Sequence, residues 1–294
     1  MQDQTADKID PVVLKCLQQL QLPAPDSHKG QNGKLLVIGG SKLFHSSIFW
    51  SADVASKIVD MVHFSSPENE NNELVRMQLK QQLWTGIVID WSEVDGYIGE
   101  DDCILIGPGM ERTPETKTIV DRLLQQHPDK KWVVDGGALQ MVNPALLKNT
   151  CIITPHEQEL KRLAAKITLT EHVSADSLEE ELSEAQLDVA LDQLLVQKVT
   201  ILRKGHVDQV YSPSLKTEVS GGNGGMTKGG TGDVLAGLVA ALYCATDATS
   251  AAVAGSYINK MAGDELYRTV GPFFNAADLV AQVPKTLWQA VKSA

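Results

Sequence analysis

The residues best suited to chemistry lie in a glycine-rich segment near the C-terminal third of the chain. It runs from Asn223 to Asp233 and precedes a small-residue, apolar run from Val234 to Ala245, which predicts a buried helix. Glycines at 229, 230 and 232 let backbone N–H groups approach a ligand without a Cβ in the way. A glycine turn at a helix start offers unpaired donors and a positive dipole end. The segment therefore predicts a site for a phosphate or another developing anion.

Asp233 places a carboxylate where the bound anion is expected. We interpret it as a proton acceptor beside a phosphate. An isolated Gly-Thr-Gly-Asp could be a loop with an N-capping Asp, but the glycine-rich lead and the long helix favour catalysis. No Gly-Lys-Ser/Thr follows the glycines, as in a Walker P-loop, and no Gly-x-Gly-x-x-Gly follows an early strand, as in a Rossmann fold. A third phosphate-binding architecture is indicated.

Short apolar runs alternate with helical patterns along the chain. We expect strands at 34–38, 61–64, 86–89, 103–106, 132–134, 151–153, 199–202, 207–211 and 217–219. Helices are expected at 9–20, 48–59, 115–126, 157–165, 233–244, 248–267 and 275–291, and the acidic stretch 174–184 reads as a solvated helix face. Continuous apolar strands separated by helices indicate a parallel sheet covered on both faces, and the hairpins after Thr200 predict an antiparallel end.

Five small or polar loops directly follow predicted strands. They are 39–41, 107–109, 135–137, 154–157 and 204–205. Because ligands of such sheets collect beyond the carboxyl ends of the strands, these loops and the glycine-rich segment predict one elongated cleft.

Composition excludes several classes of protein. The 294 residues are 43% hydrophobic and 21% charged, and the net charge of −11 argues against nucleic-acid or anionic-membrane partners. Four scattered cysteines fit a reducing compartment, and neither a signal sequence nor a run long enough to span a membrane is present. We expect a soluble, cytoplasmic protein with one domain over 1–294, in which 1–28 form a helical extension.

Six motifs together resemble the ADP- or ATP-dependent NAD(P)H-hydrate dehydratases of the ribokinase-like superfamily. They are Lys34 to Ser41, Ile106 to Met110, Val134 to Leu139, Ile153 to Glu157, Leu202 to Gly205 and Asn223 to Gly237. The resemblance covers the chain from about Lys29 to Val291, and His156 in its Thr-Pro-His-Glu setting separates this family from most kinases of the superfamily. It implies a ribokinase-like three-layer α/β/α sandwich, whose mostly parallel sheet has antiparallel end strands.

The resemblance also implies a metabolite-repair reaction. Such enzymes phosphorylate the ring hydroxyl of hydrated NADH or NADPH from ADP or ATP, and loss of phosphate then restores the ring double bond. Phosphate is a far better leaving group than hydroxide, and the transfer needs a base and donors around the migrating charge. Mg²⁺ is expected to bridge the nucleotide phosphates, with no protein ligand assigned.

The resemblance implies a role for each matching residue. In catalysis, Asp233 would be the base, and Gly230, Thr231 and Gly232 would supply the amide cradle. The nucleotide would contact Lys204, Gly205, His206, Val207, Asp208, Asn223 and Gly232. The hydrated dinucleotide would contact Ser47, Gly109, His156 and Asp233. For His156, capping of the next helix is the competing interpretation.

Three departures from the family pattern concern charge and shape. Gly137 stands where the family has a second carboxylate, Phe44 to Ser47 replace Tyr-Thr-Gly-Ala, and Lys228 replaces a small residue. Apart from the strand expected at 86–89, no structure is assigned to 65–101. Two alternatives therefore stay open: a kinase of the same superfamily acting on a hydroxymethyl heterocycle or a sugar, and a non-catalytic nucleotide-binding relative.

The expected partners are small molecules and protein chains. They are hydrated NADH or NADPH, an adenine nucleotide and further copies of this chain in a homo-oligomer. Some members of the family carry a fused epimerase domain. Because no second domain of that size precedes Lys29, we expect any NAD(P)HX epimerase to be a separate chain.

Overall fold

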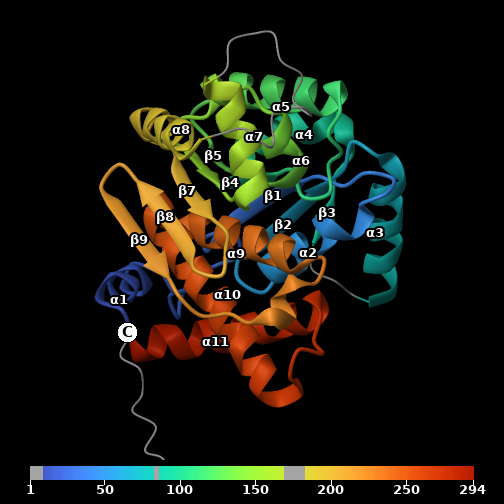
Figure 1. Ribbon diagram of the computed structural model, residues 1–294. Coiled ribbons are helices and arrows are strands. Elements are labelled where there is room, and N and C mark those ends of the chain that lie inside the picture. The colour runs from blue at the N-terminus through green and yellow to red at the C-terminus, as the bar shows by residue number, and fades with distance from the viewer. Residues whose placement is uncertain (1–8, 83–85, 169–182) are drawn as a thin grey trace, which may run out of the picture.

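One mixed sheet organises the molecule (Figure 1). The computed structural model describes residues 9–82, 86–168 and 183–294. In these residues the strand order is β3-β2-β1-β4-β5-β6-β7-β8-β9. The strands are β1 (Lys34–Ile38), β2 (Met61–Ser65), β3 (Ile87–Val88), β4 (Cys103–Ile106), β5 (Lys131–Val134), β6 (Cys151–Ile153), β7 (Thr200–Arg203), β8 (Asp208–Ser212) and β9 (Leu215–Val219). Pairing is parallel from β3 to β7 and antiparallel at β8 and β9, which confirms the predicted architecture.

Helices cover both faces of the sheet. One layer holds α4 (Val94–Glu100), α5 (Pro114–Gln126), α6 (Gly136–Met141), α7 (Glu157–Thr168) and α8 (Glu184–Val196). The other holds α1 (Pro11–Gln18), α2 (His45–Ala55), α9 (Thr231–Ala245), α10 (Ala248–Val270) and α11 (Ala276–Ser293), and α3 (Asn69–Gln82) lies beside β3 (Figure 1). Among the helices described, none combines the length and apolar character that a bilayer crossing needs.

The strands of the sheet are apolar on both faces. In β1, Leu35 and Val37 join the core beneath α2 and α9, whereas Leu36 and Ile38 join the core beneath α4 to α7. All four side chains are fully buried. Each stabilises the fold by roughly 1.5–3 kcal/mol relative to exposure. This double burial is why the strands read as continuous apolar runs rather than alternating ones.

Several helices escaped the sequence-based expectations. α3 is rich in polar residues (NENNELVRMQLKQQ), and α6 opens on Gly136 and Gly137, which read as a turn. With α4 and a 3-10 helix at Trp91–Glu93, α3 fills the segment left unassigned on either side of the predicted strand, which is β3. The expected acidic helix at 174–184 lies largely outside the described residues, and α8 begins at Glu184 behind the N-cap Ser183.

The contact between α2 and α9 depends on a glycine. A Cβ at Gly237 would lie 2.4 Å from the carbonyl oxygen and 2.6 Å from the Cα of Ser51. The Ser51 hydroxyl donates to the backbone oxygen of Asp233 at 2.8 Å, so this contact also holds the start of α9.

Gly237→Ala is expected to lower the free energy of unfolding by about 1–3 kcal/mol, because the added methyl group overpacks the interface. Urea denaturation measures the change. Gly96→Ala in α4 is the control, since no atom lies within 4 Å of the added Cβ. Equal stability of the two variants would contradict this account of the contact.

Candidate active site

The glycine-rich segment forms a loop that ends in the start of α9. Asn223 caps a short 3-10 helix (Gly224–Thr227) by accepting the Gly225 N–H at 2.9 Å. Gly230 is the N-cap of α9 and adopts φ +94°, a left-handed conformation that favours glycine. A Cβ there would also lie 2.9 Å from the Trp50 ring. The helix therefore begins where the sequence predicted a glycine turn.

The backbone N–H groups of Thr231, Gly232 and Asp233, at the start of α9, differ in whether they donate a hydrogen bond. Within the described part of the chain, the N–H groups of Gly232 and Asp233 donate to no protein acceptor. Thr231 directs its N–H to the Lys228 carbonyl at 3.4 Å, and its hydroxyl donates to Met226 and Lys228 carbonyls at 2.6 and 2.9 Å. Thr231 thus holds the loop in place through these hydrogen bonds. The free donors sit at the positive end of the α9 dipole, as an anion site requires.

Asp233 has the protonation behaviour of a general base. Burial and, to a smaller extent, the nearby charge of Asp135 raise its pKa to about 7. A hydrogen bond from Ser47 and the charge of Lys204 act in the opposite direction. A carboxylate that titrates near neutral pH can take a proton and also release it.

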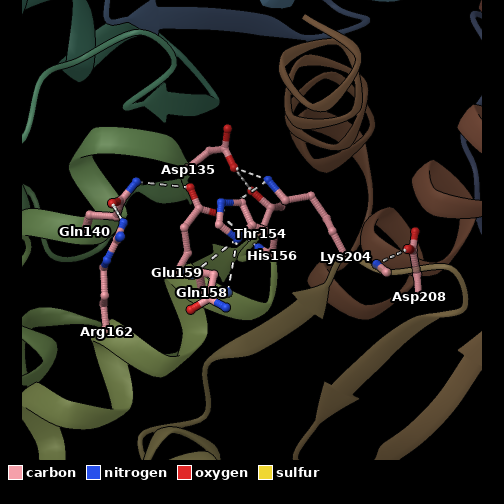
Figure 2. A network of polar contacts seen from close by, with 10 residues as sticks. Asp135, Gln140, Thr154, His156, Gln158, Glu159, Arg162, Lys204 and Asp208 are labelled. Carbon is pink, nitrogen blue, oxygen red and sulfur yellow. Dashed lines mark hydrogen bonds and ion pairs between the residues drawn. The ribbon is translucent and has the colours of Figure 1, made fainter. Parts of the chain in front are cut away.

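Lys204 stands between two buried carboxylates (Figure 2). Its Nζ lies 2.9 Å from Asp135 Oδ1 and 3.7 Å from Glu159 Oε2. Burial alone would lower the pKa of Lys204, but the charges of Asp135 and Glu159 raise it overall. Lys204 therefore stays a cation. Thr154 Oγ1 donates to the same Asp135 oxygen at 2.7 Å and holds that carboxylate in place.

The ends of three neighbouring strands bring this network together. Asp135 follows β5, Thr154 and His156 follow β6, and Lys204 follows β7. An isolated parallel bridge pairs His156 with Lys204, so the last two loops run side by side. The prediction that the post-strand loops converge on one edge is confirmed. Asp135 and Glu159 had been given no role, and Glu159 offered no signal beyond its place in the predicted helix at 157–165.

His156 contributes both to α7 and to the surface. Its Nδ1 accepts the N–H groups of Gln158 and Glu159 at 3.1 and 3.4 Å, which caps the helix as the competing interpretation had it. Its side chain is nevertheless 51% exposed, so the ring also faces solvent. Glu159 Oε2 accepts the His156 N–H at 2.9 Å, and burial raises the pKa of that carboxyl. Capping and ligand contact are therefore compatible at His156.

Two hollows flank the network. A cavity of about 390 Å³ is bounded by six residues expected at the nucleotide: Lys204, Gly205, His206, Asp208, Asn223 and Gly232. Val207 is not part of its wall and is 37% exposed. A wider groove of about 670 Å³ includes His156, Phe44 and Met110.

Gly109 and Ser47 connect this groove to Asp233. A Cβ at Gly109 would lie 2.3 Å from the Phe44 carbonyl oxygen and 3.1 Å from Ser47 Cβ. Ser47 in turn lies close enough to Asp233 to lower the pKa of that carboxyl. The four residues expected at the substrate, Ser47, Gly109, His156 and Asp233, thus lie between or beside the two hollows.

Asp208 and Lys260 shape the nucleotide-side cavity. Asp208 is buried and accepts the Gly205 N–H at 2.9 Å and the Ser256 hydroxyl at 2.7 Å. Lys260 Nζ donates to the carbonyls of Gly205, His206 and Gly221 at 3.2, 3.0 and 3.2 Å and lies 3.3 Å from Asp208. It ties together two loops of the cavity wall. A single lysine inside a helical pattern gave no sign of this role.

Lys260→Met is expected to raise the KM for ADP or ATP about tenfold, because the two loops lose a shared donor, and to leave the KM of the second substrate unchanged. Steady-state kinetics with each substrate varied in turn measures this split. Lys285→Met, at an exposed position of α11, is the matched control. Equal increases in both KM values would indicate general misfolding instead.

Two of the three departures from the family pattern, at Gly137 and Lys228, have structural explanations. A Cβ at Gly137 would lie 1.9 Å from the Met110 carbonyl oxygen, so this backbone arrangement accepts only glycine there. Lys228 Nζ donates to the Pro272 carbonyl and lies 5.3 Å from the centroid of the Phe274 ring. Its charge is therefore directed to the loop before α11 and not into the amide cradle.

The strand order, the two helical layers and the glycine turn at α9 define a ribokinase-like α/β protein. The ADP/ATP-dependent NAD(P)H-hydrate dehydratase from Bacillus subtilis, co-crystallised with ATP/Mg²⁺, shares the fold with a TM-score of 0.70 at 20% identity, over 95% of this chain and 97% of that chain. The family model described as NAD(P)H-hydrate dehydratase matches residues 35–285. The chain belongs to this family.

Two relatives place the chain within the family. The bifunctional NAD(P)H-hydrate repair enzyme Nnr of Methanocaldococcus jannaschii is 30% identical over 276 residues, which are 92% of this chain and 51% of that protein. The chain thus spans about half the length of such bifunctional relatives. The ADP-dependent (S)-NAD(P)H-hydrate dehydratase of Enterococcus faecalis is 25% identical over 252 residues, 83% of this chain and 81% of that protein.

Proposed function

We propose that this protein dehydrates hydrated NADH or NADPH at the expense of ADP or ATP. One observation carries the proposal: Asp233, with a pKa of about 7, lies at the start of α9, where free amides meet two hollows. Membership of the NAD(P)H-hydrate dehydratase family supports this substrate class. The intact base and amide cradle argue against a non-catalytic relative.

The proposed chemistry has two steps. Asp233 accepts the proton of the ring hydroxyl, whose oxygen attacks the terminal phosphorus of the nucleotide. The bond from that phosphorus to its bridging oxygen breaks and releases the shortened nucleotide, while the amides of Gly230 and Gly232 stabilise the charge on the phosphoryl oxygens. The ring carbon–oxygen bond then breaks and phosphate leaves with the bonding electrons. The neighbouring ring carbon gives a proton to water, and the electrons of that carbon–hydrogen bond form the ring double bond.

The nucleotide is assigned to the 390 Å³ cavity. Lys204, Gly205, His206, Asp208, Asn223 and Gly232 bound it, and Lys204 can approach a phosphate from the side of the cradle, since a Cβ at Gly232 would lie 3.9 Å from its Nζ. Asp208 acts through the loop that it holds. Val207 remains a predicted contact of the nucleotide, although it does not line this cavity.

Mg²⁺ is the expected companion of the nucleotide phosphates. The described side chains contain no group of three or more His, Cys, Asp or Glu residues arranged to hold a metal. The buried carboxylates of Asp135 and Glu159 are paired with Lys204, and that of Asp208, in the cavity wall, is paired with Lys260. These residues do not fit a metal site held by the protein. We therefore assign Mg²⁺ no protein ligand and no step.

The test is incubation of the protein with hydrated NADH or NADPH and either ADP or ATP, followed at the absorbance of reduced nicotinamide. Recovery of absorbance is expected, with one shortened nucleotide and one phosphate formed per ring restored. No recovery, with a stable phosphate ester of another alcohol, would identify a small-molecule kinase. Consumption of neither substrate would leave only a binding protein.

The rate of this reaction is expected to depend on pH through Asp233. Its pKa is raised to about 7, so the carboxyl is protonated, and inactive as a base, at lower pH. The value of kcat/KM should therefore rise tenfold per pH unit below about 7 and level off above it. Initial rates between pH 5 and 9 at constant ionic strength measure this. A flat profile would contradict the assigned base.

A cytoplasmic location, a homo-oligomer and a separate epimerase chain stay predictions from the sequence. Relatives such as the enzyme of Methanocaldococcus jannaschii are bifunctional and longer than this chain, as the name of that protein states. Size-exclusion chromatography and assay of the chain on each epimer of the hydrate address the last two.

A further inference from the structure

The cavity assigned to the nucleotide contains a buried polar side chain that the proposed chemistry does not use. Asn259 lines this cavity and is 4% exposed, and its Oδ1 is buried without a hydrogen-bond partner. Within the described residues, Ser212 Oγ is the one other side-chain atom in this condition, and Ser212 does not line the cavity. Because a buried acceptor without a partner costs free energy, such an atom in a cavity wall indicates a bound donor.

The other buried polar side chains of this wall already have partners. Asp208 accepts from the Ser256 hydroxyl at 2.7 Å and lies 3.3 Å from Lys260 Nζ. The Thr231 hydroxyl donates to the Met226 carbonyl, and Lys260 donates to three carbonyls. Among the buried polar side chains that the structure describes in this wall, Asn259 is therefore the one whose acceptor remains available to a ligand.

The packing of two helices fixes the position of Asn259. Residues 246–247 join α9 to α10, and helices joined by so short a connection run antiparallel. A Cβ at Gly255 would lie 2.7 Å from Val239 Cγ2, which sets the level at which the two helices meet. Asn259 is one turn further along α10, and Leu235 is one turn back along α9. Both line the cavity, so Asn259 lies at the level of Leu235.

The wall around Asn259 suits the base of a nucleotide. The apolar side chains of this wall are Leu235 and Met226. A Cβ at Gly263 would lie 2.4 Å from Met226 Sδ, so the thioether rests on α10 one turn after Asn259. Gly232, whose amide is assigned to the phosphates, precedes Leu235 by three residues, or about 4.5 Å along α9. Apolar surface for a ring and an amide for its edge thus lie next to the phosphate site.

We propose that Asn259 recognises the adenine base of the nucleotide. Its Oδ1 accepts a hydrogen bond from the N6 amino group, and its Nδ2 donates to the neighbouring ring nitrogen. An asparagine amide is complementary to adenine in this way, because adenine has a donor and an acceptor side by side. This inference rests on the proposed function and adds to it the residue that selects the base of the co-substrate.

Asn259→Leu removes both hydrogen bonds and keeps a side chain of similar size. We expect the Kd for ADP, measured by calorimetry without the second substrate, to rise about tenfold. Purine riboside 5′-diphosphate has the same ring as ADP but lacks the amino group. The wild-type protein should bind it about tenfold more weakly than ADP, whereas Asn259→Leu should bind the two ligands alike.

Two measurements separate recognition of the base from a structural role. In the absence of nucleotide, the Tm of Asn259→Leu should equal or exceed that of wild type, because leucine needs no hydrogen-bond partner. The values of kcat and of the KM for the hydrated dinucleotide should stay unchanged, since this side chain does not reach the reacting atoms. A lower Tm together with a lower kcat would assign Asn259 a structural role and reject the proposal.

Two further variants complete the test. Asn259→Ala removes the same amide without a larger group, so it should lose ADP affinity to the same extent even where leucine fits poorly. Asn149→Leu, at an exposed position before β6, is the matched control and should change no constant. An unchanged Kd for ADP in both Asn259 variants would overturn the proposal and leave a water molecule as the partner of Oδ1.

The binding measurements also separate this proposal from the proposed function. Weaker ADP binding by Asn259→Leu, with the difference between the two diphosphates lost, supports recognition of adenine even when no hydrated dinucleotide is turned over. Turnover by the wild-type protein, with the same ADP affinity in the Asn259 variants, would reject the role of Asn259 and leave the proposed function standing. Absence of ADP binding to the wild-type protein would reject the role of Asn259 as well.

Discussion

Asp233→Asn is expected to lower kcat by a factor of about 10² to 10⁴, because an amide cannot accept the proton of the ring hydroxyl. The change preserves the size of the side chain and a partner for Ser47. The KM values for both substrates should therefore change little, and the affinity for ADP should stay within a few-fold of wild type. Single-turnover and steady-state measurements with hydrated NADH determine the loss.

We also expect Asp233→Asn to change how the stability of the protein depends on pH. The folded-state pKa of Asp233 is about 7 and the ordinary value is 3.8, so ionisation is disfavoured in the folded protein. The wild-type protein is therefore more stable at low pH, where Asp233 is protonated in both states. This stability is lost as the pH rises from 3.8 to about 7. Asp233→Asn should lack this dependence and match or exceed wild-type stability at pH 8.

The control for Asp233→Asn is Asp192→Asn, the same change at an exposed position of α8. It should leave both kcat and the pH profile unchanged. Turnover by Asp233→Asn at the wild-type rate would show that Asp233 is not the base, and the proposed chemistry would then fail.

Lys204→Met is expected to give the second large effect, on stability and activity together. Asp135 and Glu159 would lose the cation that lies 2.9 and 3.7 Å from their oxygens. Leaving buried carboxylates without a partner should lower the free energy of unfolding by about 3 kcal/mol. Because the charge of Lys204 also lowers the pKa of Asp233, the acid limb of the pH–rate profile should move to higher pH.

Guanidinium chloride denaturation and the pH dependence of kcat/KM measure these two effects separately. Lys148→Met, at an exposed position before β6, is the matched control and should change neither quantity. Lys204→Arg keeps the charge and should restore most of the stability. A Lys204→Met protein with an unshifted acid limb would show that Lys204 does not act on Asp233 electrostatically.

Local patterns in the chain were sufficient to predict the sheet and most of its helices. The inner strands, such as β1 and β4 to β6, are buried on both faces, so each stands out as a short apolar run between polar turns. The start of α9 was equally predictable, because the glycine at 230 and the apolar run after 233 are both local signals of a helix start. α3 and α6 were missed because a polar helix and a glycine-initiated helix lack those local signals.

The sequence by itself therefore determined the class of fold and the place of the proposed base at the start of α9, since both depend on neighbouring residues. Only the tertiary structure decided which groups surround that base. Asp135 and Lys204 are 69 residues apart and meet because β5, β6 and β7 end at one edge of the sheet. Local sequence cannot encode such a meeting, because it depends on strand order and on which loops the helices bring within reach. The raised pKa of Asp233 follows from that arrangement.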